Sequence, residues 1–149
     1  MNPKQIILVE WTVRRTRTQR AAIAADFYDR LFAAHPELHA MFPADTDEQA
    51  EKFAAELDAI VGAMRHSPTL VTRASLLGAR HDRYGVTPSH YAAAGAALLG
   101  ALAAALGPAW TPTVEEAWRC AFDLVAEEMM AGASAREPVS SRAAHFPQT

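Results

Sequence analysis

The amino-acid sequence predicts an all-α fold in a single domain. Strand signals are nearly absent, because no run of β-branched residues exceeds three and no Asn-Gly or Asp-Gly turn separates alternating segments. Alanine, leucine and glutamate dominate, and apolar residues recur every three or four positions, as on one face of a helix. The 149 residues have the usual length of one domain.

The helices can be placed in order from their periodicity and their end signals. Ser67-Pro68, Thr87-Pro88 and Thr111-Pro112 each supply a capping hydroxyl followed by a first-turn proline. Gly85 suits a left-handed helix end, and Gly107-Pro108 stops the helix before it. These signals predict helices over residues 4–19, 20–34, 47–64, 68–83, 88–106 and 112–130, with a short turn over 36–42.

The end of the chain differs in composition from the rest. The segment "GASAREPVSSRAAHFPQT" lacks helical periodicity and is rich in serine, alanine and proline. We therefore expect one domain over residues 1–131 and a flexible tail over residues 132–149.

Composition excludes several classes of protein. Half of the residues are hydrophobic and 21% are charged, which predicts no run of about eighteen apolar residues that could span a membrane. The N-terminus lacks the order of a secretory signal, so we expect a cytoplasmic protein. The net charge of -3 argues against nucleic-acid binding, and the run formed by Arg14, Arg15, Arg17 and Arg20 is interpreted as a solvated helix face.

Three polar side chains fall on apolar helix faces. His81 lies four residues after Leu77 and shares its face, while Gln49 begins the face that Phe53 continues. Tyr28 falls on the apolar stripe of the second helix. A buried imidazole, amide or phenol is costly unless its polar atoms find partners, so these groups need an explanation.

Each of these side chains also has a purely structural interpretation. His81 can bond a backbone carbonyl or Tyr91. Gln49 can close a capping box with Thr46 at the start of its helix. Tyr28 can be a core residue whose hydroxyl reaches the surface.

Several metal and catalytic sites can be excluded. A di-iron bundle needs Glu-x-x-His pairs, which the chain lacks, and zinc needs several converging ligands. Cys120 is the single cysteine, so neither an internal disulfide nor the Cys-x-x-Cys-His attachment of haem is available. The remaining histidines are scattered: His35, His39, His66, His90 and His145. No nucleophile motif is present, so no catalytic residue is predicted. A single internal histidine instead suits a bound group that contains a metal and supplies the other metal-coordinating atoms itself.

Three segments resemble bacterial globins, in order and at compatible spacings. "FYDRLFAAHPELHAMFP" over 27–43 resembles their second helix and haem-packing turn. "GARHDRYGVTPSHYAAAGAALLGAL" over 78–102 is similar to the stretch with their proximal histidine, and "EEAWRCAFDLVAEEM" resembles their last helix. The similarity covers about residues 4–130 and is greatest to single-domain bacterial globins and the haem domains of flavohaemoglobins. It implies the globin fold, a three-on-three helical sandwich around haem.

On the proximal side, the resemblance implies that His81 is the iron ligand. Tyr91 matches the tyrosine that orients this histidine by hydrogen bonding. Flavohaemoglobins add a carboxylate on the last helix, whereas ungapped extension places Ala133 there, with Glu127 and Glu128 nearby. The resemblance to their proximal network is therefore incomplete.

On the distal side, the resemblance implies that Tyr28 and Gln49 donate hydrogen bonds to a bound gas. Phe42 matches the ring that packs on the haem. Phe53 falls where these globins usually place a smaller apolar residue, so it is expected to narrow the gas pocket. The absence of Cys-x-x-Cys-His implies non-covalent haem b.

The resemblance implies reversible binding of O2, with NO and CO as further gas ligands. It also implies dioxygenation of NO if a separate reductase supplies electrons, because the chain contains no Gly-x-Gly-x-x-Gly motif for a nucleotide-binding domain of its own. A gas sensor, or a haem-free interaction module with the same fold, is the alternative.

Overall fold

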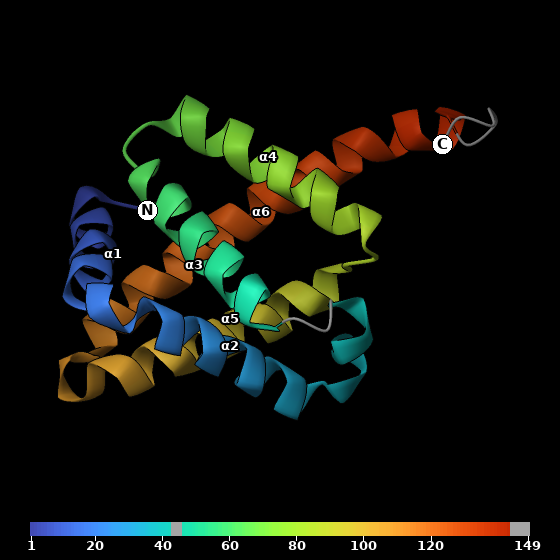
Figure 1. Cartoon of the computed structure of the whole chain (residues 1–149). Helices are drawn as coiled ribbons and strands as arrows, with labels where there is room; N and C mark the ends of the chain where they lie inside the picture. Colours follow the sequence, from blue (N-terminus) through green and yellow to red (C-terminus); the bar gives the residue numbers. More distant parts are fainter. Residues whose placement is uncertain (43–45, 144–149) are drawn as a thin grey trace.

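The computed structural model describes residues 1–42 and 46–143, and this part of the chain contains helices and turns without any strand. The all-α prediction is confirmed. The helices are α1 (Pro3–Arg15), α2 (Arg20–Ala34), α3 (Thr46–Gly62), α4 (Ser67–Arg83), α5 (Pro88–Leu106) and α6 (Pro112–Ala143), shown in Figure 1. Short 3-10 turns cover Arg17–Gln19, Pro36–Met41 and Gly107–Ala109.

The helix starts follow the predicted signals with one correction. The Thr111 hydroxyl accepts a hydrogen bond from the Val114 amide at 3.2 Å, as expected for a cap at the start of α6. At α4, Ser67 is already the first helical residue, and the predicted cap at Ser67 is wrong. The imidazole of His66 takes its place and accepts a hydrogen bond from the Thr69 amide at 3.3 Å.

The first helix ends earlier than predicted. Helix α1 stops at Arg15 rather than near residue 19, and Thr16 caps it. The Thr16 hydroxyl donates a hydrogen bond to the Thr12 carbonyl at 2.7 Å, and both threonines are buried. A turn over Arg17–Gln19 then redirects the chain into α2.

The last helix is longer than predicted, because it continues to Ala143 instead of ending near residue 130. Gly132 lies inside this helix, and a Cβ there would come within 3.0 Å of the Ser75 backbone in α4. The glycine therefore permits a close helix crossing and does not mark a helix end. The proposed division at residue 131, with a flexible tail beyond it, stays a prediction, and residues 144–149 lie outside the described part.

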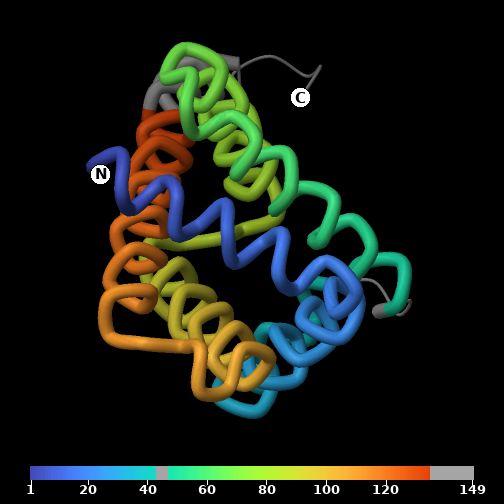
Figure 2. The backbone as a smooth tube through the Cα atoms, turned by 90° about the vertical axis from the view of Figure 1, so that its left-hand side faces the viewer, coloured from blue at the N-terminus to red at the C-terminus, as the bar shows by residue number. Residues whose placement is uncertain are grey.

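The helices form two sets of three that pack on one another. Helices α1 and α4 pack on α6, and α3 packs on α2, while α5 lies between α2 and α6. Figures 1 and 2 show α4 beside α6 and α2 beside α5 in both views. The core they enclose includes the fully buried side chains of Val9, Thr12, Leu102 and Trp118.

The apolar composition of helix α5 contradicts one prediction made from the sequence. The segment Pro88–Ala109 is long and apolar enough to cross a membrane, so the prediction that no such segment exists is wrong. The core helix of a soluble protein passes the same test. Ala97, Leu98, Ala101 and Leu102 are buried here, and the helix contacts both α2 and α6. About a third of this apolar stretch, 33%, is buried in the structure, so packing against two neighbours accounts for part of its apolar composition.

Candidate functional site

Tyr28 lies at the centre of a cluster of aromatic rings. It is 6% exposed on α2, and its ring makes edge-to-face contacts with Phe27, Phe42 and Phe53 at centroid distances of 4.9, 5.3 and 5.8 Å. Phe32 stacks beside it at 5.8 Å. The rings come from α2, from α3 and from the residue that follows the turn Pro36–Met41, so the tertiary structure brings them together.

Gln49 is the polar partner of Tyr28 within this cluster. Its side-chain amide donates a long hydrogen bond of 3.4 Å to the phenol oxygen. Burial raises the pKa of Tyr28, and the hydrogen bond from Gln49 only partly opposes this shift. The phenol therefore stays protonated at neutral pH. Because its oxygen accepts from Gln49, its own O–H is available to donate to another molecule.

The other interpretation of Gln49 was a capping box with Thr46. The Gln49 amide turns toward Tyr28 on another helix. The contribution of the Thr46 side chain lies outside the described residues, so the capping box itself stays untested.

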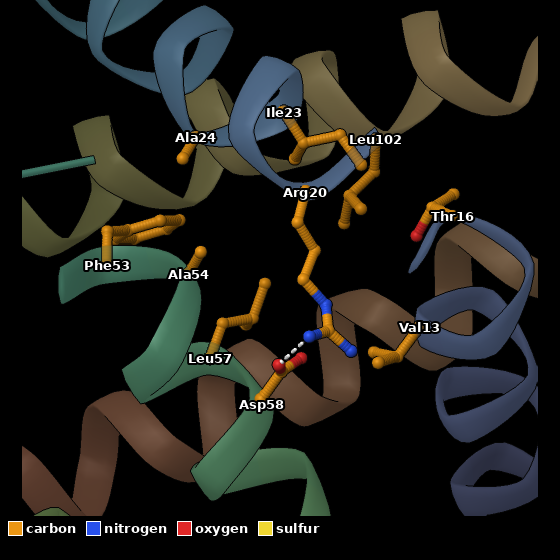
Figure 3. Close-up of a pocket in the computed structure, with 10 residues that line it drawn as sticks. All are labelled: Val13, Thr16, Arg20, Ile23, Ala24, Phe53, Ala54, Leu57, Asp58 and Leu102. Carbon is orange, nitrogen blue, oxygen red and sulfur yellow. Dashed lines mark ion pairs between the residues drawn. The ribbon is translucent and has the colours of Figure 1, made fainter. Parts of the chain in front are cut away.

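Phe53 forms a wall between Tyr28 and a small pocket. Its ring stacks on Phe27 with a centroid distance of 4.2 Å and an interplanar angle of 13°. The same side chain lines a pocket enclosed by α1, α2, α3 and α5, drawn in Figure 3. Across this pocket, the Arg20 guanidinium pairs with the Asp58 carboxylate at 2.5 Å.

His81 is half-buried near the end of α4, and its ring is fixed by its own helix. Its Nδ1 lies 2.8 Å from the Leu77 carbonyl oxygen. A carbonyl can only accept, so Nδ1 carries the hydrogen and Nε2 keeps its lone pair. Burial lowers the pKa of His81, and the nearby Arg80 adds to this, against opposing effects of the Leu77 bond and Glu56. The imidazole is therefore held neutral, with one nitrogen ready to act as a ligand.

Tyr91 was expected to orient His81 by hydrogen bonding, and this role stays a prediction, since here the Leu77 carbonyl holds the ring. Tyr91 is half-buried on α5, and in the described part of the chain no hydrogen bond links it to His81. Burial raises the pKa of Tyr91, and the Asp82 carboxylate raises it further. Glu127 and Glu128 make no hydrogen bond to either side chain within the same residues.

The structure thus brings together Tyr28, Phe42, Gln49 and Phe53, and it places His81 on a separate helix. Among residues 1–42 and 46–143, no three His, Cys, Asp or Glu side chains converge in a way that could hold a bare metal ion. The site therefore offers one neutral nitrogen ligand and a separate aromatic cluster with two polar groups.

Sequence reasoning missed part of this arrangement. The stacking of Phe27 on Phe53 was not predicted, although both residues fall on apolar helix faces. Arg20 was interpreted as part of a solvated helix face. Its guanidinium instead pairs with the carboxylate of Asp58, which lies 38 positions further along the chain. No local pattern in the sequence signals that pair.

Comparison with known proteins decides the family. The family model described as Globin matches residues 25–129, which is more than half of the chain. The chain belongs to the globin family. The expected globin fold is confirmed, since solved globin structures superpose on nearly the whole chain.

Among relatives, this globin is 35% identical over 133 residues to a flavohemoprotein of Deinococcus radiodurans, covering 87% of the chain and 33% of that protein. It is 29% identical over 130 residues to a flavohemoprotein of Bacillus subtilis, with 85% and 33% covered. The globin thus spans about a third of the length of these curated relatives.

Two solved structures share the fold. An engineered carbene transferase derived from a candidate nitric oxide dioxygenase of Rhodothermus marinus gives a TM-score of 0.82 at 26% identity, covering 95% of this globin and 99% of that chain. A hexacoordinated haem protein of an anhydrobiotic tardigrade also gives 0.82, at 16% identity, with 90% and 96% covered. The second likeness concerns the fold alone.

Proposed function

We propose that this globin binds haem b non-covalently, with His81 as the iron ligand. The observation that carries the proposal is the 2.8 Å hydrogen bond from His81 Nδ1 to the Leu77 carbonyl, which leaves Nε2 free. Burial keeps the ring neutral, as a metal ligand must be. The donor set also fits haem, because the porphyrin supplies the remaining nitrogen ligands that the described residues lack.

The aromatic cluster would form the opposite side of the site. Phe42 and Phe53 offer ring faces suited to a large apolar disc, and Tyr91 would lie toward the His81 side. Haem iron, when bound, supplies an open coordination position for a diatomic gas.

We propose reversible O2 binding as the function. The Tyr28 hydroxyl would donate a hydrogen bond to the gas, since its oxygen already accepts from Gln49 and its hydrogen is uncommitted. Gln49 would hold the phenol in place, and the surrounding rings would exclude water. A hydrogen bond to a polar, partly charged ligand is stronger than one between neutral groups, so Tyr28 would slow release of O2 in particular.

The test is the visible absorption spectrum of the purified protein, reduced and then exposed to O2 and to CO, beside His81→Ala. We expect an intense Soret band that shifts with each gas in the parent and is weak or altered in the variant. If the parent takes up no haem from an excess, the proposal falls, and a haem-free interaction module takes its place.

Dioxygenation of NO is the second candidate function. It is favoured by the likeness to two flavohemoproteins and to the engineered enzyme derived from a candidate nitric oxide dioxygenase. Sustained turnover would need electrons from a flavin-containing reductase, and we propose such a protein as a cytoplasmic partner. Many turnovers of NO to nitrate with an added reductase and nicotinamide would support this role. A single turnover that stops once the bound O2 is consumed would leave O2 binding as the function.

A sensing role is the remaining alternative. A sensor converts gas binding into a change at a surface that a partner recognises. Equal amide exchange in the haem-loaded protein with and without O2 would argue against it.

A further inference from the structure

A single carboxylate, that of Glu56, connects helices α3 and α4. Its Oε2 accepts a hydrogen bond of 2.7 Å from Arg73 Nε, and its Oε1 accepts a longer one of 3.5 Å from Arg73 Nη2. The same Oε1 lies 3.8 Å from Nη2 of Arg80, about two turns further along α4. Arg73 and Arg80 share one face of α4, so one carboxylate holds two guanidinium groups.

This bridge lies between two helices that otherwise have little contact. Figures 1 and 2 show α3 and α4 diverging from the corner that joins them, and they touch less than α3 touches α2 or α4 touches α6. Glu56 lies six residues before the end of α3 at Gly62, and Arg73 lies six residues after the start of α4 at Ser67. The two side chains therefore meet across the angle between the helices.

The bridge also connects the two sides of the candidate site. Glu56 follows Phe53 by about one turn of α3, and Arg80 directly precedes His81 on α4. A change in the angle between α3 and α4 would therefore move the aromatic cluster relative to His81.

The carboxylate is the least exposed of the three charged groups. The Glu56 side chain is 24% exposed, whereas Arg73 and Arg80 are 46% and 54% exposed. Charges in a partly buried network interact more strongly than an isolated pair on the surface, because less water screens them. The anion lies between two cations, which favours a fixed geometry.

The charges of the bridge also act on the imidazole of His81. Burial has the largest effect on the pKa of His81 and lowers it, and the Arg80 charge lowers it further, whereas Glu56 raises it. Glu56 thus offsets part of the effect of Arg80 at the ring. The same opposition would act on a metal ion bound to the ring, because Coulomb forces act on any charge at that place.

We propose that Glu56 is a positioning residue for haem, which fixes the angle between α3 and α4 and offsets the charge of Arg80 beside the iron ligand. The inference rests on the proposed binding of haem by His81. Ferric haem iron carries one positive charge more than ferrous iron, so a nearby carboxylate favours the ferric form and a nearby guanidinium favours the ferrous form. Glu56 therefore lowers the reduction potential of bound haem, and Arg80 raises it.

The first test measures the reduction potential of the haem-loaded protein by spectroelectrochemistry at the Soret band. In Glu56→Gln, we expect the ratio of ferrous to ferric protein at a fixed potential to rise about threefold to tenfold, which is about 30 to 60 mV for a one-electron couple. Arg80→Gln should shift the potential by a similar amount in the opposite direction. The double variant should return close to the potential of the parent.

The opposite signs separate a charge effect from a purely structural one. A bridge that only held the fold together would be broken by either substitution, and the potential would shift in the same direction in both variants. Shifts in the same direction, or no shift in Glu56→Gln, would overturn the proposal.

Glu10→Gln is the matched control for the loss of a carboxylate. Glu10 also accepts hydrogen bonds from an arginine of another element, Arg65, but it lies on α1. This variant should keep the potential of the parent. A rise equal to that in Glu56→Gln would show that the loss of any such carboxylate has the same effect, and would overturn the role of Glu56.

The second test measures the bridge itself, by urea unfolding of the protein as purified. Glu56→Gln, Arg73→Gln and the double variant form a cycle with the parent. We expect the two substitutions to be non-additive by about twofold to tenfold in the equilibrium constant of unfolding. Additive effects would overturn the bridge. This cycle does not depend on haem uptake, so its failure is separable from failure of the proposed function, which would show as a missing Soret band.

Discussion

At the scale of single residues, two hydrogen bonds determine what the candidate site can do. The Leu77 carbonyl fixes the hydrogen of His81 on Nδ1, and the Gln49 amide occupies the oxygen of Tyr28. One bond leaves a free lone pair and the other leaves a free O–H. The two residues thus present opposite chemistry, a base for a metal and a donor for a polar ligand.

Tyr28→Phe should speed release of O2 from the haem-loaded protein about tenfold to a hundredfold. The reason is the loss of one hydrogen bond to a polar ligand, which contributes about 1.4 to 2.8 kcal/mol. Stopped-flow displacement of O2 by CO measures this rate. Tyr84→Phe is the matched control, because Tyr84 is 74% exposed. A release rate in Tyr28→Phe equal to that of the control would show that the phenol does not hold the gas.

At the scale of helices, the crossing of α4 and α6 positions His81. Gly78 lies one turn before it, and a Cβ at Gly78 would come within 3.0 Å of the Met129 backbone. Gly132 makes the reciprocal approach to Ser75. The absence of two side chains thus lets the helix that carries His81 lie directly on the backbone of α6.

Gly78→Ala should therefore destabilise the protein by about 1 to 3 kcal/mol, because the added methyl group meets backbone that cannot move aside. Gly62→Ala provides the comparison, since nothing lies within 4 Å of a Cβ at that position. Urea unfolding followed by circular dichroism gives both values. Equal stability of the two variants would contradict a close crossing at Gly78.

An ion pair links α1 to the corner between α3 and α4, and it predicts a dependence on pH. Arg65 contacts both carboxylate oxygens of Glu10, at 2.8 and 2.7 Å. The hydrogen bond from Arg65 lowers the pKa of Glu10 below its ordinary 4.5. As the pH falls, the unfolded chain therefore takes up this proton before the folded chain does. The contribution of Glu10 is present above pH 4.5 and is lost as the pH falls through the folded pKa.

Glu10→Gln should thus be less stable than the parent at neutral pH, and the difference should shrink as the pH falls below 4.5. Urea unfolding at a series of pH values measures it. Asp29→Asn is a control on α2, because Asp29 is exposed and has no ion pair among the described residues. A difference that grows in acid would show the opposite sign of linkage.

At the scale of the whole molecule, haem would act as part of the core. The aromatic cluster and His81 come from different helices, so a ligand that contacts both would link helices that otherwise touch little. A ligand that binds only the folded state stabilises it by mass action, by about 4 kcal/mol at a thousand times its Kd.

Removal of haem should therefore lower the free energy of unfolding by several kcal/mol, on the order of 4, and His81→Ala should lose part of that gain. Urea unfolding of haem-loaded and haem-free protein, for the parent and the variant, gives the four values. If haem adds the same stability to the parent and to His81→Ala, the histidine is not the ligand.

The helices, and the faces on which their residues lie, follow from local patterns in the sequence. Helical spacing placed Tyr28, Gln49, Phe53 and His81 on apolar faces, because the positions three and four residues apart are set by backbone geometry alone. The same local rule relates His81 to Leu77. Motifs in order then indicated the family, which the match over residues 25–129 established.

Which of these faces meet depends on how the helices pack in three dimensions. The contact of Gln49 with Tyr28 and the pairing of Arg20 with Asp58 join different helices. Gly132, which ends a periodic pattern in the sequence, proved to be a close crossing inside a helix that continues to residue 143. Such contacts depend on how whole helices pack. Packing is set by many contacts between residues that are far apart in the chain, so no short stretch of sequence predicts it.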